Sequence, residues 1–228
     1  MNNIVLNIPH CSTGRIFDLG KWPHNPHFIN SVVRSVTDWY TDFLFYSHNI
    51  AVQEVVFPYS RLVCDVTGSD EESIIWKSQG GYNRGNLTDS DRTALHDLHR
   101  KHNDKLKCLI NEESVLIECH SFTGEETEYD ILVGTIDWEQ NKDIVDIAMG
   151  EFKNSGYSVN ILDGEEFAFT PSCKSMFIKV NRRIYMNHNL LLLDLNSRQW
   201  MRWFGCLNRI YDKLLTNESQ KTAIAEEV

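Results

Sequence analysis

The sequence lacks the long apolar run that a membrane-spanning helix needs. No stretch approaches about 18 consecutive apolar residues without charge, so we expect no transmembrane helix. Residues 1–8 contain no basic region ahead of an apolar core and pass directly into a strand pattern, so we also expect no signal peptide. No membrane partner is therefore expected.

Positive charge is also scarce. The 228 residues include 22 Lys and Arg against 32 Asp and Glu, a formal net charge of −10. A protein that grips phosphate backbones would carry the opposite sign, so we expect no nucleic-acid partner. An anionic substrate would have to be held by local positive groups rather than by the overall field.

Paired cysteine motifs are absent as well. The six cysteines lie at positions 11, 64, 108, 119, 173 and 206 and form no C-x-x-C pair. A zinc ribbon or a disulfide framework is therefore a poor interpretation, and reduced thiols in a cytoplasmic protein fit better. No linker composition interrupts the chain, which predicts one domain over residues 1–228, with a flexible tail from about 216.

Strand and helix patterns alternate along the chain. The expected strands are 4–8, 51–56, 62–66, 115–119, 130–135, 157–162 and 176–180. The expected helices are 25–44, 88–109, 141–154 and 197–215, of which the second begins at a capping box, Thr88-x-x-Asp91. This alternation predicts an α/β fold with a mostly parallel central sheet.

Two histidines stand where such a sheet binds ligands. His10 directly follows the first expected strand, and His120 ends the fourth. Ligands bind at the carboxyl ends of parallel strands, so both imidazoles could converge on one crevice. Imidazole is a common zinc ligand, and a catalytic zinc takes three protein ligands. The alternatives are a loop histidine beside Pro9 and a histidine that caps a turn.

Two carboxylates are further candidates for the same site. Glu118 precedes His120 by two residues and so shares its strand face, where it could act as general base. By the same two-residue alternation, Asp65 shares a strand face with Arg61. The two could form a simple ion pair. Alternatively, Asp65 completes a metal site, or Arg61 grips a substrate carboxylate in a bidentate fork.

The remaining titratable residues carry weaker patterns. His102 lies on the apolar stripe of its helix, which is typical of a hydrogen-bonded core histidine. His96, His99 and His102 do not predict a metal cluster, because the outer pair spreads over about 120°. Asp38 and Asp42 are four apart on one expected helix and are interpreted as a solvated face.

One ordered series of segments comprises residues 8–14, 59–66, 116–122, 130–135, 156–159 and 180–186, with Thr41-Asp42 and His102 between them. Taken together, these segments are similar to successive motifs of the N-formylglutamate amidohydrolase family. The family is similar to the zinc carboxypeptidases. The resemblance implies a three-layer α/β/α fold of the zinc-exopeptidase type, and hydrolysis of an N-formyl or related N-acyl amide of an acidic amino acid.

The resemblance also implies roles for particular residues. His10 and His120 become ligands of one zinc ion, with Asp65 or an acid near it as the third ligand. The residues assigned to the substrate are Arg61, His102, Asn181 and Arg182. A carboxylate would carry the proton to the leaving amine.

The chain departs from the family pattern at three places. Residues 65–68 read Asp-Val-Thr-Gly where the family has Asp-Val-Glu-Arg, and residues 134–140 lack the family's histidine. Lys179 stands where the family has a glutamate that resembles the general base of carboxypeptidases, and a lysine does not accept a proton at its usual pKa. Either Glu118 takes the role, with Lys179 paired to it or to Asp65, or the chain is a weakly active or non-catalytic relative that binds a metal or an acidic small molecule.

Overall fold

The computed structural model describes residues 3–14, 32–69, 87–123, 127–162, 169–187 and 192–226; over 217–226 it describes the helix but not the side chains. The beginning of the expected helix at 25–44 and most of the glycine-rich and serine-rich stretch 67–87 lie outside these residues. Within the described parts, no helix combines the length and the apolar character needed to cross a membrane.

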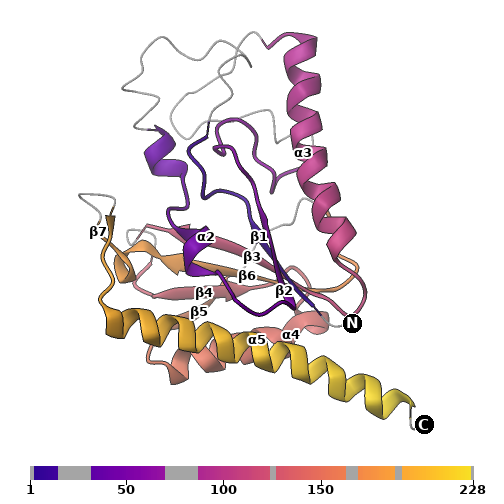
Figure 1. The fold of residues 1–228 in the computed structure, drawn as a ribbon, viewed down its shortest axis with the longest axis vertical. Helices are drawn as coiled ribbons and strands as arrows, with labels where there is room; N and C mark the ends of the chain where they lie inside the picture. Colours follow the sequence, from indigo (N-terminus) through magenta and orange to yellow (C-terminus); the bar gives the residue numbers. More distant parts are fainter. Residues whose placement is uncertain are drawn as a thin grey trace.

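Six strands form one mixed sheet (Figure 1). They are β1 (Ile4–Ile8), β2 (Val52–Val56), β3 (Val115–Phe122), β4 (Ile131–Gly134), β5 (Val159–Leu162) and β6 (Lys174–Asn181), in the spatial order β2-β1-β3-β6-β4-β5. The β4–β6 pair is antiparallel and the other four pairs are parallel. The mostly parallel α/β sheet expected from the sequence is confirmed.

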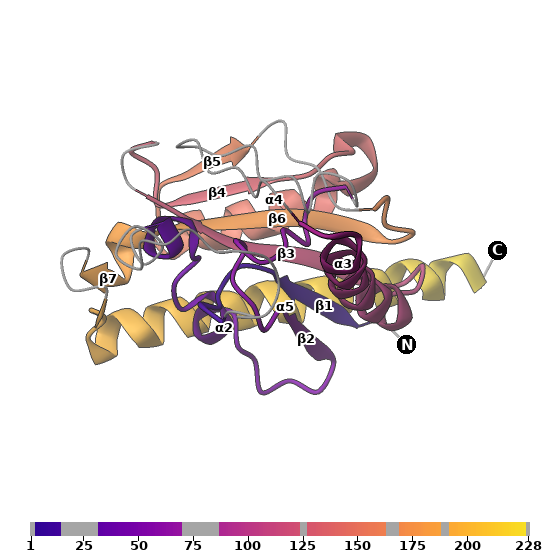
Figure 2. The same ribbon diagram turned by 90° about the horizontal axis from the view of Figure 1, so that it is seen from above.

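Helices cover both faces of this sheet, as Figure 2 shows from above. On one face lies α3 (Asp89–Leu109), and on the other lie α4 (Trp138–Asn154) and α5 (Ser197–Glu226). The expected capping box is present, since Thr88 accepts a hydrogen bond from the Asp91 amide while the Asp91 carboxylate accepts from that of Thr88. The shorter elements are α2 (Thr41–Leu44), a 3₁₀ turn (Arg182–Ile184), β7 (Met186–Asn187) and β8 (Leu192–Leu193).

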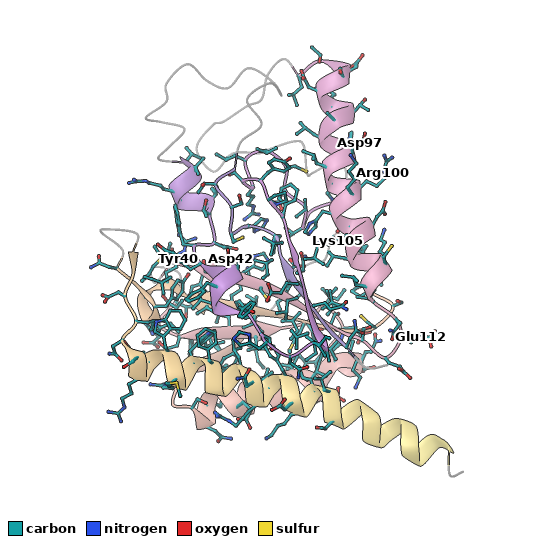
Figure 3. The ribbon with its side chains drawn as sticks, in the orientation of Figure 1. Tyr40, Asp42, Asp97, Arg100, Lys105 and Glu112 are labelled. Atoms are coloured by element: carbon teal, nitrogen blue, oxygen red, sulfur yellow. The ribbon has the colours of Figure 1, made fainter. Side chains whose placement is uncertain are left out.

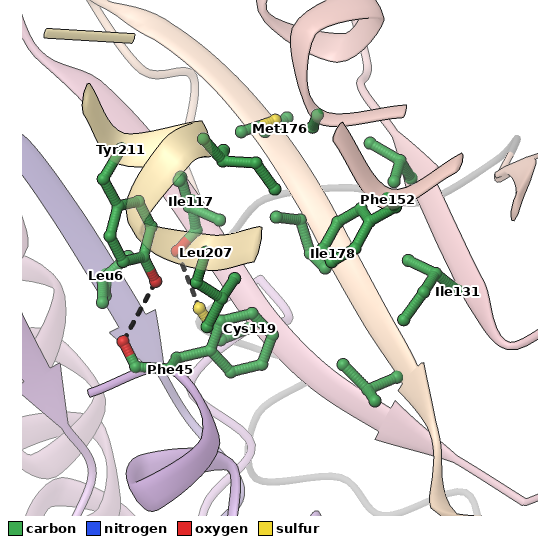
Figure 4. Close-up of a cluster of buried hydrophobic side chains, with 14 of the residues drawn as sticks. Leu6, Phe45, Ile117, Cys119, Ile131, Phe152, Met176, Ile178, Leu207 and Tyr211 are labelled. Carbon is green, nitrogen blue, oxygen red and sulfur yellow. Dashed lines mark hydrogen bonds between the residues drawn. The ribbon is translucent and has the colours of Figure 1, made fainter. Parts of the chain in front are cut away.

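The central strand β3 is buried on both faces, and its alternation decides where polar side chains can point. Ile117 and Cys119 face α5 within the main apolar cluster, where Leu207 and Tyr211 pack near them (Figure 4). Leu116 faces the opposite way, in a cluster with Leu106 of α3. Glu118 and His120 follow the Leu116 alternation, so both belong to the α3 side of the sheet.

The segment expected as a strand at 62–66 is instead a turn. The Ser60 hydroxyl accepts from the amide of Leu62, and the Ser60 carbonyl accepts from that of Val63. Val63 and Cys64 pack against Leu95 of α3 in a small apolar cluster. An apolar run predicts burial but does not by itself distinguish a strand from a buried turn, and this explains the wrong expectation.

The helix expected to continue to residue 44 is interrupted. Residues 32–36 are helical, the chain then turns, and α2 supplies only four residues. Tyr40 adopts a left-handed backbone with φ of 64°, which a continuous helix excludes. The Thr37 and Thr41 hydroxyls bond to the carbonyls of Val33 and Asp38, so side chains satisfy the interrupted backbone.

Candidate metal centre

His10 and His120 lie side by side at the carboxyl ends of β1 and β3. These strands are adjacent and parallel, with Asn7 opposite Glu118 in the register. The ring centroids are 5.0 Å apart, and the two residues are 1% and 7% exposed. The structure thus brings together the two histidines that the sequence pattern singled out, and it buries both.

Asp38 completes the group from the turn ahead of α2. Its Oδ2 lies 2.8 Å from Nδ1 of His120 and 3.5 Å from Nδ1 of His10. The amide of Asp38 donates to the carbonyl of His10 at 2.9 Å, which ties the turn to the end of β1. One ligand atom from each of the three residues lies within 4.8 Å of the others, and all three residues are buried.

Each imidazole also contacts a second carboxylate, through its Nε2 atom. Nε2 of His10 is 3.0 Å from Oδ1 of Asp65, and Nε2 of His120 is 2.9 Å from Oε1 of Glu118. Both rings therefore direct Nδ1 toward Asp38 and direct Nε2 to a carboxylate. Histidines that bind metals commonly donate their second ring N–H to such a partner, which fixes the tautomer and the ring orientation.

This arrangement gives Asp65 a place different from the one expected. Asp65 lies on the Nε2 side of His10, where it also accepts hydrogen bonds from Nε of Arg61 at 2.7 Å and from Thr67. Asp38 occupies the position between the two rings that the sequence interpretation gave to Asp65. The Arg61–Asp65 ion pair considered from the sequence is present.

The charges in the group depend on one another. Burial opposes ionisation of Asp38, but the neighbouring imidazoles of His10 and His120 outweigh it and hold the pKa of this carboxyl well below its usual range. Burial also opposes charge on His120, but hydrogen bonds to Asp38 and Glu118 raise the pKa of His120 to about 9. Asp38 and His120 therefore each favour the charged form of the other.

The donor set fits a divalent metal ion. Nδ1 of His10 is buried and has no hydrogen-bond partner among the described residues, although an unpaired buried nitrogen normally costs free energy. This nitrogen faces Asp38, as does Nδ1 of His120. Two imidazole nitrogens and one carboxylate are a common protein set for a catalytic zinc, which keeps a further position open.

Arg182 supports Asp38 from the side. Its Nε donates to Oγ of Ser121 at 3.1 Å, its Nη2 donates to the carbonyl of Thr37 at 2.7 Å, and Nη2 is 3.6 Å from Oδ1 of Asp38. Ser121 in turn donates to the same Oδ1 at 3.2 Å. Arg182 is only 6% exposed. These contacts fix Asp38, and the substrate role expected for Arg182 stays a prediction.

Each of the other expected substrate residues has contacts outside the group of His10, Asp38 and His120. Arg61 contacts Asp65 and its side chain is 40% exposed. Asn181 caps the 3₁₀ turn through the amide of Arg183 and donates to the carbonyl of Tyr129. His102 bonds to Asn7, and burial lowers its pKa to about 3, so it is a neutral, hydrogen-bonded histidine. The substrate roles of all three stay predictions.

Lys179 lies directly opposite His120 in the register of β3 and β6, and it is half-buried. Residues opposite each other in neighbouring strands point to the same face, so Lys179 belongs to the face that carries the candidate metal centre. Its pairing with Glu118 or Asp65 stays a prediction.

The residue that the sequence interpretation missed is Asp38. It was treated as equivalent to Asp42 on a solvated helix face, but Asp38 is 6% exposed while Asp42 lies on the surface of α2 beside Tyr40 (Figure 3). The sequence does hold one weak signal. Four of the six residues at 32–37 are β-branched, which disfavours a continuing helix ahead of Asp38.

Comparisons with known proteins identify the family and the fold. A family model described as N-formylglutamate amidohydrolase matches residues 2–186. The fold is similar to that of the N-formylglutamate amidohydrolase from Ralstonia eutropha JMP134, with a TM-score of 0.71, 14% identity, and coverage of 95% of this chain and 93% of that one. A gene product of Agrobacterium tumefaciens is similar at a TM-score of 0.67 and 17% identity, covering 94% of this chain and 91% of that one. No curated protein sequence matches the chain.

Proposed function

Because the chain belongs to the N-formylglutamate amidohydrolase family, we propose that it is a metal-dependent hydrolase of the N-formyl or a related N-acyl amide of an acidic amino acid, such as N-formylglutamate. The observation that carries the proposal is the buried group of His10, Asp38 and His120, with its unpaired imidazole nitrogen. Zinc is the expected ion.

The chain's own residues prepare this site. His10, Asp38 and His120 would hold the ion, which when bound supplies the Lewis acidity that polarises the amide carbonyl and activates water. With the ion bound, Asp65 and Glu118 would accept the Nε2 protons of the two histidines, and so leave the Nδ1 lone pairs on the side of Asp38.

Local positive charge supports an acidic substrate. The chain is strongly acidic overall, so an anion gains nothing from the general field. Arg61 and His10 both contact Asp65, and the Arg61 side chain is partly open to solvent. Lys179 lies on the same sheet face as His120. Both cations are therefore candidates for contact with the acidic group of a substrate bound at the two histidines.

A second candidate is a relative that binds a metal and an acidic ligand with little or no turnover. Each of the three carboxylates described around the two histidines already has an assigned contact: Asp38 lies between the rings, and Asp65 and Glu118 lie behind them. Glu118 is 2% exposed, and its two oxygens accept from His120 and Asn7. This favours a positioning role for Glu118, and Lys179 stands where the family has its glutamate.

The test is zinc content and turnover of the same purified protein. We expect one zinc per chain, loss of that zinc in His120→Ala, and its retention in the control His48→Ala, which changes an exposed histidine of the loop before β2. Formate release from N-formyl-L-glutamate, compared with N-formyl-L-leucine, then separates the candidates. Zinc binding without release of formate from either compound supports the second candidate, and absence of zinc binding overturns both.

A further inference from the structure

A continuous line of buried hydrogen bonds joins helix α3 to the metal centre. His102 Nε2 is 2.9 Å from Oδ1 of Asn7, Asn7 Nδ2 is 3.4 Å from Oε2 of Glu118, and Glu118 Oε1 is 2.9 Å from Nε2 of His120. The four residues come from α3, β1 and β3. Their exposed fractions are 7%, 3%, 2% and 7% along the line, so water does not compete strongly for these bonds.

The direction of each bond follows from the groups involved. Burial keeps His102 neutral, with a pKa of about 3, so only one of its ring nitrogens carries a proton. The amide of Asn7 donates from its NH₂ to Oε2 of Glu118, and an amide oxygen can only accept. Its oxygen therefore faces His102, and the proton of His102 must reside on Nε2. The ring of His102 is held in place edge-on to Phe57, with centroids 5.4 Å apart.

The hydrogen bond with His102 fixes the orientation of the Asn7 amide. With the donor of His102 in place, the amide presents NH₂ to Oε2 of Glu118. Without that donor, rotation of the amide would place its oxygen against the carboxylate and repel it. Glu118 would then lose one of the two contacts that orient it toward Nε2 of His120.

We propose that Asn7 and His102 are positioning residues that orient Glu118, and through it His120, for metal binding. We call the line His102–Asn7–Glu118 the positioning relay. The proposal rests on the proposed function, because it assumes that His120 binds a metal ion. It assigns His102 a task at the metal centre without contact with the ion or the substrate.

The experiment measures zinc affinity of the full chain by competition with a chromogenic chelator, and the visible spectrum of the cobalt-loaded protein. The variants are His102→Leu, which removes the donor, and His102→Gln, which restores one. The matched control is His99→Leu. His99 lies one turn earlier on α3 and is also 7% exposed, but it bonds to the carbonyl of Gly68.

We expect His102→Leu to weaken zinc binding about 10- to 100-fold, the usual range for loss of an outer partner of a metal-bound histidine. The cobalt spectrum should change with it. His102→Gln should recover most of the affinity, and His99→Leu should lie within about threefold of the native protein. Equal loss in His102→Leu and His99→Leu, or no loss in His102→Leu, would overturn the positioning relay. If His102→Leu does not fold, Asn7→Leu removes the same two bonds from β1 and is expected to give the same loss.

A double-mutant cycle separates the failure of this inference from failure of the proposed function. The unfolding free energies of His102→Leu, Glu118→Gln and the double variant need no metal. Destabilisations that are less than additive support a relay between the two residues, and full additivity contradicts it. A native protein that binds no zinc overturns the proposed function, while the cycle still decides whether the relay exists.

Discussion

Oδ2 of Asp38 lies 2.8 Å from Nδ1 of His120, although 82 residues separate them in the sequence. His10, 3.5 Å from the same oxygen, comes from a third segment of the chain. One carboxylate therefore joins two adjacent strands to the turn ahead of α2. Asp38 therefore links the three segments that form the candidate metal centre.

Replacement of Asp38 should abolish tight zinc binding. Asp38→Asn keeps the shape but removes the anionic ligand, and we expect zinc affinity to fall by more than about 100-fold, beyond the usual cost of losing an outer partner. Isothermal titration with zinc measures this directly. The matched control is Asp42→Asn, four residues later and exposed, which should bind zinc as the native chain does. Equal binding by both variants would remove Asp38 from the ligand set.

Arg61 should contribute to recognition of an acidic side chain. For Arg61→Ala we expect the KM for N-formyl-L-glutamate to rise about tenfold, with a smaller change for a neutral N-formyl amino acid, because one partly exposed charge-assisted contact is lost. Steady-state kinetics on both substrates provide the comparison. Arg100→Ala is the control, since Arg100 pairs with Asp97 on the exposed face of α3 (Figure 3). An equal rise for both substrates would assign Arg61 only to the support of Asp65.

Lys179 should limit turnover. A cation on the face of the metal centre repels a dication and lowers the basicity of nearby carboxylates. We therefore expect low activity of the native protein on N-formylglutamate and a gain in kcat for Lys179→Glu, which restores the residue of the family pattern. Robust native turnover that is unchanged in Lys179→Ala would show that the proton is carried elsewhere.

His102 should make stability depend on pH in the acid range. Its pKa is lowered to about 3 in the folded chain, from an ordinary value of 6.5, mainly by burial. Between these values the unfolded chain binds a proton that the folded chain does not. The unfolding free energy therefore falls as the pH falls below 6.5, by up to about 1.4 kcal/mol per pH unit.

Urea unfolding of the native chain and of His102→Gln at pH 7, 6 and 5 tests this contribution. The glutamine does not titrate, so the stability advantage of the native chain over the variant should shrink on acidification. A constant difference across the three pH values would mean that His102 does not carry the dependence.

The sheet and the two histidines could be predicted because their patterns are local. Apolar runs ending at His10 and near His120 indicate strands, and the carboxyl-edge rule for parallel sheets brings their ends together. The alternation that linked Glu118 to His120 also appears in the structure, as a direct hydrogen bond. These features depend on neighbours in the sequence and on one general rule of packing.

Asp38 and Asn7 could not be predicted in the same way, because their contacts are not local. Asp38 reaches the site only because the helix stops at residue 36 and the chain turns, which hydroxyl–carbonyl bonds of Thr37 and Thr41 stabilise. Asn7 appeared as one polar residue within an apolar strand, and its partners lie 95 and 111 residues away. Helical periodicity and strand alternation carry no information at that range.

The contacts of α5 limit how far the chain can be truncated without loss of the candidate site. The family model ends at residue 186, yet Tyr211 of α5 donates to the carbonyl of Phe45 at the end of α2 (Figure 4). Trp203 of α5 likewise donates to the carbonyl of Leu44. Because α2 ends there, no following helical turn supplies N–H groups from which these carbonyls could accept. A fragment that ends at residue 186 would therefore lose these two hydrogen bonds, which support the segment that carries Asp38. Engineering of this scaffold should treat α5 as part of the support of the candidate site rather than as a removable extension.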